Sequence, residues 1–138
     1  MLLAGSNVFV YSNVFVYARS RHRHADACRA LIAAAPDHPE WVVPALVLLE
    51  VTHYYRDRGD YARRILAAFP PVETLTADLE WAFARCPDHR DLADPILLAS
   101  ADRLGADGIV SLDRFFDRQA LVPRIRRIDP ARATTLGA

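Results

Sequence analysis

The chain has 138 residues, of which 52% are hydrophobic and 25% are charged, and its formal net charge is zero. This length and composition predict a single globular domain over residues 1–138 with enough apolar residues for a packed core. Because acidic and basic residues balance, no net field attracts nucleic acid, so any contact with RNA must come from local basic clusters. The longest apolar run, at residues 42–49, is too short to span a bilayer, so no membrane association is expected.

Cysteine usage points to the compartment. Cys28 and Cys86 lie far apart without partners at metal-ligand spacing, and nothing resembles a signal sequence ahead of a cleavage site. We therefore expect free thiols in a reducing, cytoplasmic environment.

A tandem duplication opens the chain: residues 6–11 and 12–17 both read SNVFVY. Six residues is far below the period of a solenoid repeat, so we interpret the duplication as a local insertion with only one copy in the ancestral role. Residues 8–11 are β-branched and aromatic, which predicts a first, central strand and a helix opening at Ser12 and Asn13. The alternative places the strand at residues 2–4. The sequence leaves both open.

Basic side chains crowd the segment that precedes a helix predicted over residues 25–35. Arg19, Arg21 and Arg23 are interleaved here with two histidines. One interpretation is a solvated loop. The other is a rim that contacts RNA phosphates without reading the sequence.

Short strands and helices alternate through the remainder of the chain. Such alternation predicts an α/β domain whose parallel sheet is covered on both faces. The expected strands are residues 41–43, 72–75, 108–112 and 125–128, and the expected helices are residues 44–59, 60–69, 76–86 and 91–104.

Three acidic residues stand beside apolar segments. Glu50 is the only acid in its apolar helical run, Asp94 lies in the first turn of a predicted helix, and Asp113 directly follows a predicted strand. Ligands of open parallel sheets bind beyond the carboxyl ends of the strands, and carboxylates suit Mg²⁺ or Mn²⁺. Such an ion activates water and stabilises the charge that develops on a phosphodiester. Asp117 either joins this set or caps the final loop. The plainer interpretation of each acid is a helix cap, a turn residue or an exposed helix position.

Other catalytic motifs are absent from the sequence. It contains no GxSxG elbow, no P-loop, no GxGxxG and no HExxH. A receiver-like or phosphatase-like domain would need an acid near the first strand, and this strand has none.

Three segments together resemble a known family. PALVLLEV at 44–51, DLADPILLASA at 91–101 and IVSLDRFFD at 109–117 resemble, in order and spacing, the acidic motifs of PIN-domain ribonucleases, most of all small VapC-type toxins of bacterial toxin-antitoxin pairs. The resemblance implies a PIN-like three-layer α/β/α fold with a central, mostly parallel sheet of four or five short strands. It implies a homodimeric endoribonuclease that requires Mg²⁺ or Mn²⁺ and is inhibited by a cognate antitoxin. Glu50, Asp94 and Asp113 would be the catalytic metal ligands, and Ser111 would match the small hydroxyl residue before the last acid.

The first family motif departs from this pattern. In the family, the first strand ends in Asp, followed by Ser or Thr, Asn and an apolar residue. Both copies of the duplication supply the Ser and Asn, but Gly5 and Tyr11 stand where the Asp belongs. Asn7 or Asn13 would remain as a polar residue that orients rather than chelates. We therefore expect cleavage that is weakened or lost, because even the loss of a residue that only supports a metal ligand costs about 10 to 100-fold. The alternative function is a catalytically inactive PIN-fold module that binds antitoxin or RNA.

Overall fold

A five-stranded sheet organises the part of the chain that the structure, a computed structural model, describes, residues 8–135. The strands run in the order β3-β2-β1-β4-β5, and every neighbouring pair is parallel. The predicted parallel sheet is confirmed, with β1 at its centre. The strands are β1 (Val8–Val10), β2 (Trp41–Pro44), β3 (Pro71–Val72), β4 (Gly108–Val110) and β5 (Arg126–Ile128).

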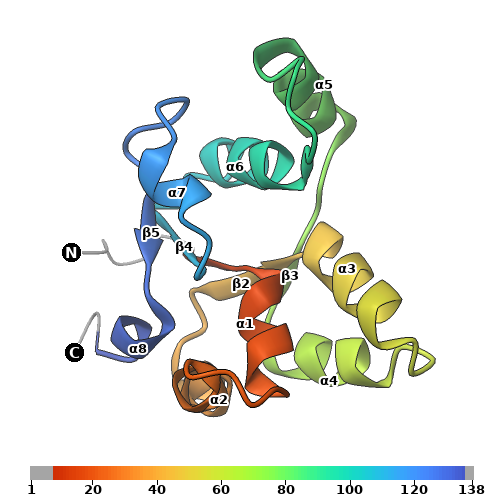
Figure 1. Cartoon of the computed structure of the whole chain (residues 1–138), viewed down its shortest axis with the longest axis vertical. Coiled ribbons are helices and arrows are strands. Elements are labelled where there is room, and N and C mark those ends of the chain that lie inside the picture. Colours follow the sequence, from red (N-terminus) through yellow and green to blue (C-terminus); the bar gives the residue numbers. More distant parts are fainter. Residues whose placement is uncertain (1–7, 136–138) are drawn as a thin grey trace.

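Helices cover both faces of the sheet. Figure 1 shows α5 and α6 on one side and α1, α2 and α4 on the other, which confirms the expected three-layer α/β/α architecture. Within residues 8–135, no helix is long and apolar enough to cross a membrane. The helices are α1 (Ser12–Ala18), α2 (Ala25–Ala34), α3 (Ala45–Tyr55), α4 (Asp60–Ala68), α5 (Thr76–Arg85), α6 (Ala93–Arg103), α7 (Phe115–Arg118) and α8 (Pro130–Ala133), with a 3-10 turn at Ala35–Asp37.

The two copies of SNVFVY take different structures. Val8–Val10 of the first copy form β1, whereas Ser12 of the second copy opens α1. The second copy therefore occupies the position after the first strand, and Tyr11 stands where the family motif has its Asp. The alternative strand at residues 2–4 lies outside the described residues, as do Gly5 and Asn7.

Side chains from elsewhere in the fold hold the short helix α1 in place. A helix of seven residues rich in Val and aromatic side chains is marginal by itself, and the last four carbonyls of a helix lack partners within it. Here each of these four carbonyls accepts a hydrogen bond from a side chain. The pairs are Tyr61 hydroxyl to Phe15 O (2.8 Å), Tyr55 hydroxyl to Val16 O (3.2 Å), Ser20 hydroxyl to Tyr17 O (2.8 Å) and Arg29 guanidinium to Ala18 O (3.0 Å).

The third strand is shorter than the sequence predicts. It covers only Pro71–Val72, because Leu75, assigned above to the end of the strand, is the N-cap of α5. The Leu75 backbone N–H donates to the Asp78 carboxylate at 2.9 Å, which draws this residue into the start of the helix. The N-cap of α5 is therefore Leu75. Both cysteines are free, as expected.

Candidate active site

Three acidic side chains from distant parts of the chain meet beside the carboxyl end of β1. Glu50 comes from the middle of α3, Asp94 from the first turn of α6, and Asp113 from the turn after β4. Their charges act on one another, since Asp94 raises the pKa of Glu50 and Asp113 raises the pKa of Asp94. The sequence-based expectation that these three acids lie close together agrees with this coupling. We call Glu50, Asp94 and Asp113 the acidic cluster.

Burial makes Glu50 and Asp94 hard to ionise. It raises the pKa of Glu50 to about 7, and the charges of Asp91 and Asp94 add to the rise, while the neighbouring Ser12 hydroxyl opposes it. Burial likewise raises the pKa of Asp94 to about 6. The Oε1 atom of Glu50 is buried and has no hydrogen-bond partner within the described part of the chain. A carboxylate in this state is costly, so the cluster stores unfavourable free energy that a proton or a cation can relieve.

Tyr11 contacts the most buried acid of the cluster. Its hydroxyl donates a hydrogen bond to Asp94 Oδ1, and this bond partly offsets the rise in the pKa of Asp94. Both side chains are nearly inaccessible, with exposed fractions of 6% for Tyr11 and 8% for Asp94. The sequence marked Tyr11 only as the place of a missing acid and carried no signal that its phenol would bind Asp94.

Asn13 and Ser111 connect the start of α1 to the turn that carries Asp113. The Asn13 amide donates to the Ser111 hydroxyl at 2.9 Å and accepts from the Leu112 backbone N–H at 3.3 Å. The Ser111 hydroxyl also accepts from the Asp113 N–H at 3.0 Å. Asp113 in turn accepts from the Phe115 N–H at 2.9 Å at the start of α7. Asn13 and Ser111 therefore hold the turn that carries Asp113 against the start of α1.

Asp117 is engaged away from the acidic cluster. Its carboxylate pairs with Arg127 at 2.9 Å and with Arg114 at 3.6 Å. Neither of its predicted roles, an additional metal ligand or a cap of the final loop, describes these contacts. The carboxylate instead joins α7 to the edge strand β5.

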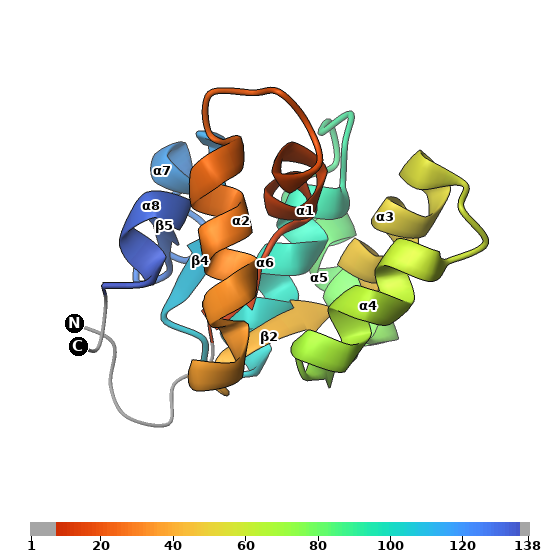
Figure 2. The ribbon, with the colours of Figure 1, turned by 90° about the horizontal axis from the view of Figure 1, so that it is seen from below.

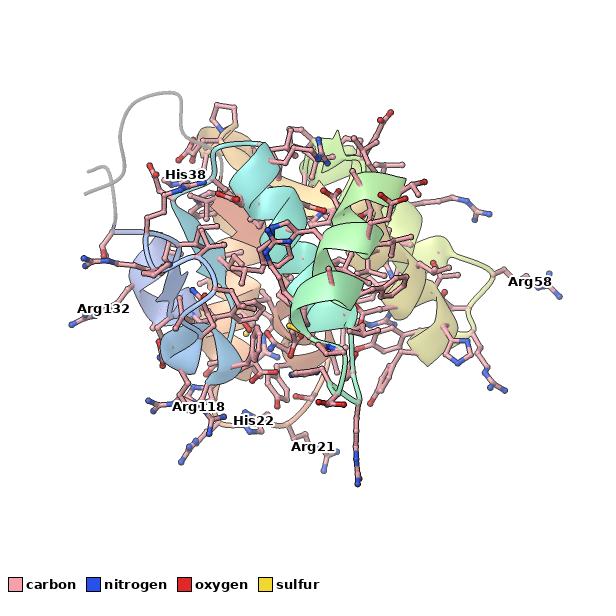
Figure 3. The ribbon with its side chains drawn as sticks, turned by 90° about the horizontal axis from the view of Figure 1, so that it is seen from above. Arg21, His22, His38, Arg58, Arg118 and Arg132 are labelled. Atoms are coloured by element: carbon pink, nitrogen blue, oxygen red, sulfur yellow. The ribbon has the colours of Figure 1, made fainter. Side chains whose placement is uncertain are left out.

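The basic loop between α1 and α2 lies at the same end of the molecule as α7 and the loop that precedes α6 (Figure 2). Arg19 is held in this loop, with its guanidinium 4.7 Å from the Tyr55 ring centre and 4.5 Å from that of Tyr61. Arg21 extends outward from the same edge as Arg118, and His22 lies there too (Figure 3). The His22 ring stacks on Tyr17, with centres 4.3 Å apart and planes 14° apart.

Asp78, which lies on the same side of the sheet as α6, has a structural role that the sequence did not reveal. Asp78 of α5 is buried and accepts from Arg103 Nε and Nη2, each at 3.0 Å, and from the Ser100 hydroxyl at 2.8 Å. These bonds hold the pKa of Asp78 below its ordinary value although burial opposes them. Because Arg103 and Ser100 belong to α6, the contact fixes the helix that presents Asp94.

The acidic cluster has the donor chemistry of a divalent metal site but lacks its arrangement. Carboxylate oxygens are the ligands that Mg²⁺ and Mn²⁺ prefer. Among the described residues, however, no group of three His, Cys, Asp or Glu side chains is placed to hold a metal ion. One oxygen of Asp94 is also already bound by the Tyr11 hydroxyl. The residues present therefore do not fit the implied ion in this arrangement.

Comparison with known proteins agrees with the fold and with the sequence motifs. The PIN domain family matches residues 8–121. Among solved structures, the VapC20 toxin of Mycobacterium tuberculosis, which cleaves the sarcin-ricin loop, is similar with a TM-score of 0.58 at 15% identity; the match covers 80% of this chain and 93% of that one. Comparison with curated protein sequences gives no significant match. The family match extends from β1 through the turn that carries Asp113, and the chain therefore belongs to the PIN-domain family.

Proposed function

We propose that this chain is an attenuated endoribonuclease of the VapC toxin type, which hydrolyses RNA phosphodiester bonds slowly. The observation that carries the proposal is the meeting of Glu50, Asp94 and Asp113, on three separate elements, at the carboxyl end of β1. Bound Mg²⁺ or Mn²⁺ is the expected cofactor of such a nuclease. Because the described residues do not present three ligands, we expect weak metal binding and slow cleavage.

The side chains of the acidic cluster suit proton transfer at neutral pH. Glu50 has a pKa of about 7, so both of its protonation states are populated there. A general acid or base works best when its pKa lies near the operating pH. We propose that Glu50 holds or moves the proton, whereas Asn13 and Ser111 keep Asp113 oriented toward the same place.

RNA binding is assigned to the basic loop. Arg21 and Arg23 are exposed, and they lie beside the ring of His22, itself stacked on Tyr17. Arg side chains bind backbone phosphates, and aromatic rings stack on unpaired bases. Arg19, held between two tyrosine rings, would act mainly by shaping the loop. An RNA hairpin that contains the sarcin-ricin loop is the first substrate to test, because the similar VapC20 toxin cleaves that loop.

A homodimer and a cognate antitoxin complete the proposed toxin role, in a cytoplasmic setting. Both partners need exposed apolar surface. Leu49 of α3 is 66% exposed, and Phe83 of α5 is 52% exposed. These side chains supply surface of the required kind.

The second candidate is a catalytically inactive PIN-fold module that binds antitoxin or RNA. The hydrogen bond between Tyr11 and Asp94 favours it, because a buried donor occupies the acid that a catalytic cation would need. If the chain is such a module, its affinity for antitoxin or RNA should be the same with and without a chelator.

One experiment separates the two candidates. Purified chain is incubated with a labelled hairpin RNA in Mn²⁺ or in EDTA, beside the variants Tyr11→Asp and Glu50→Gln. An attenuated nuclease cleaves slowly in Mn²⁺, gains rate with Tyr11→Asp and loses its remaining rate with Glu50→Gln. If the unaltered chain and Glu50→Gln give the same product as buffer alone, while both bind the RNA in EDTA, the binding module is the correct assignment.

A further inference from the structure

We propose that Tyr11 is an internal plug of the acidic cluster, where its phenol takes the place of a cation and its hydroxyl holds Asp94 against metal binding. The plug is more than an absent ligand. If a ligand were only absent, the remaining acids would still be free to bind a metal ion weakly. If Tyr11 is a plug, the metal ion must first displace its hydroxyl from Asp94. The inference concerns the cluster itself and holds whether or not the chain cleaves RNA.

The backbone and ring of Tyr11 are both fixed. Its N–H donates to Val110 O at 3.0 Å, which continues the pairing of β1 with β4 by one residue. Its ring packs against Phe116, with ring centres 5.5 Å apart and planes 58° apart. Only 6% of Tyr11 is exposed. The phenol therefore cannot swing into solvent without loss of a packed contact.

The hydroxyl of Tyr11 is a neutral donor to the cluster, held against Asp94 by its hydrogen bond. Burial, together with the hydrogen bond to Asp94 and the charges of Asp94 and Glu50, raises the pKa of Tyr11 above its ordinary value. A neutral donor supplies one hydrogen bond and no charge. It satisfies Asp94 Oδ1 and leaves Glu50 Oε1 buried without a partner within residues 8–135. A divalent cation could bind oxygens of both acids, whereas the single Tyr11 hydroxyl binds only one of them. The Glu50 oxygen is therefore left unpaired.

A variant that removes the phenol without adding an acid distinguishes a plug from a ligand that is only missing. If Tyr11 were only a missing ligand, Tyr11→Asp alone would improve metal affinity. If Tyr11 is a plug, Tyr11→Ala also improves it, because the oxygen of Asp94 and the space beside it become available. A hydrogen bond to a charged group shifts an equilibrium by about tenfold or more, and a cation that must first break this bond loses that factor, so we expect Mn²⁺ to bind Tyr11→Ala at least about tenfold more tightly than the unaltered chain.

The test is a titration of the full chain with Mn²⁺. Binding is measured by calorimetry and by the electron paramagnetic resonance signal of free Mn²⁺. The variants are Tyr11→Ala and Tyr11→Asp, with Tyr54→Ala as a matched control at an exposed tyrosine. The plug predicts that affinity rises in Tyr11→Ala, rises further in Tyr11→Asp and stays unchanged in Tyr54→Ala. Equal affinity of Tyr11→Ala and the unaltered chain, with a gain only in Tyr11→Asp, would overturn the proposal. So would an unaltered chain that already binds as tightly as Tyr11→Asp.

A conservative variant covers the case in which Tyr11→Ala does not fold. Tyr11→Phe keeps the ring against Phe116 and removes only the donor. The plug predicts that Mn²⁺ raises the melting temperature of Tyr11→Phe more than that of the unaltered chain. An identical response of the two proteins to Mn²⁺ would overturn the proposal. Neither measurement uses RNA, so failure of the plug and failure of the nuclease assignment are distinguishable.

Discussion

The substitution Asp94→Asn should stabilise the protein at neutral and alkaline pH. Asn keeps the shape of the side chain and an oxygen that accepts from the Tyr11 hydroxyl, but it carries no charge. The pKa of Asp94 rises from 3.8 to about 6 on folding, chiefly through burial. A shift of about two units corresponds to about 3 kcal/mol, and Asp94 is too buried for solvent to reduce this greatly. We expect a gain of about 2 to 3 kcal/mol in the free energy of unfolding at pH 8.

The pH at which the gain vanishes tests the sign of this reasoning. A carboxyl with a raised pKa binds its proton more tightly in the folded state, so its protonation favours folding. In the unaltered chain, this contribution is fully present below pH 3.8, declines as pH rises and is lost above pH 6. Asp94→Asn should therefore match the unaltered chain near pH 4 and exceed it at pH 8.

Urea unfolding in EDTA, followed by tryptophan fluorescence from pH 4 to pH 8, measures both quantities. Asp88→Asn is the control, because Asp88 lies six residues earlier, is exposed and carries the same charge. It should give little gain. Parallel pH profiles for Asp94→Asn and the unaltered chain would refute the reasoning, as would an equal gain from Asp88→Asn.

Three further predictions follow from contacts outside the acidic cluster. Asp78→Asn should lower the free energy of unfolding by about 2 to 3 kcal/mol in urea denaturation, because Arg103 loses its buried counter-charge; a loss below about 1 kcal/mol would contradict this. Because the pKa of Asp78 is lowered, its contribution in the unaltered chain should be present above pH 4 and be lost in acid. Tyr61→Phe should cost about 1 kcal/mol in the same assay by leaving a carbonyl of α1 without its donor, and an unchanged midpoint would count against that role. Arg21→Ala combined with Arg23→Ala should weaken RNA binding and reduce the slope of log affinity against log salt by about 1.4, and an unchanged slope would place the RNA elsewhere.

The positions of the acids could be predicted because local signals agree with the family motifs. Asp94 and Asp113 stand at the start of a helix and just after a strand, and Glu50 interrupts an apolar helical run. In a parallel sheet, such positions converge on the carboxyl ends of the strands, so their proximity follows once the element order is known. The pairing of Asp78 with Arg103 could not be predicted, because it depends on how α5 lies against α6.

The role of Tyr11 could not be predicted either. A tyrosine after a strand is ordinarily a packed residue, and nothing near it in the chain marks a hydrogen bond to Asp94, 83 positions away. The sequence established that an acid is missing. The side chain that occupies the position of the missing acid depends on which residues form β1. The duplication left that choice open in the sequence.

The amino-acid sequence by itself determined the order of strands and helices, the family and the three acids of the cluster, because these depend on local patterns. Tertiary structure alone decided between the two copies of SNVFVY. Identical residues have identical intrinsic propensities, so only their surroundings can make Val8–Val10 a strand and Ser12–Ala18 largely a helix. The first copy pairs with β2 and β4 on both sides, whereas the carbonyls of the second are bound by side chains from α3 and α4. Hydrogen bonds and burial supplied by distant residues outweigh a local preference that the two copies share.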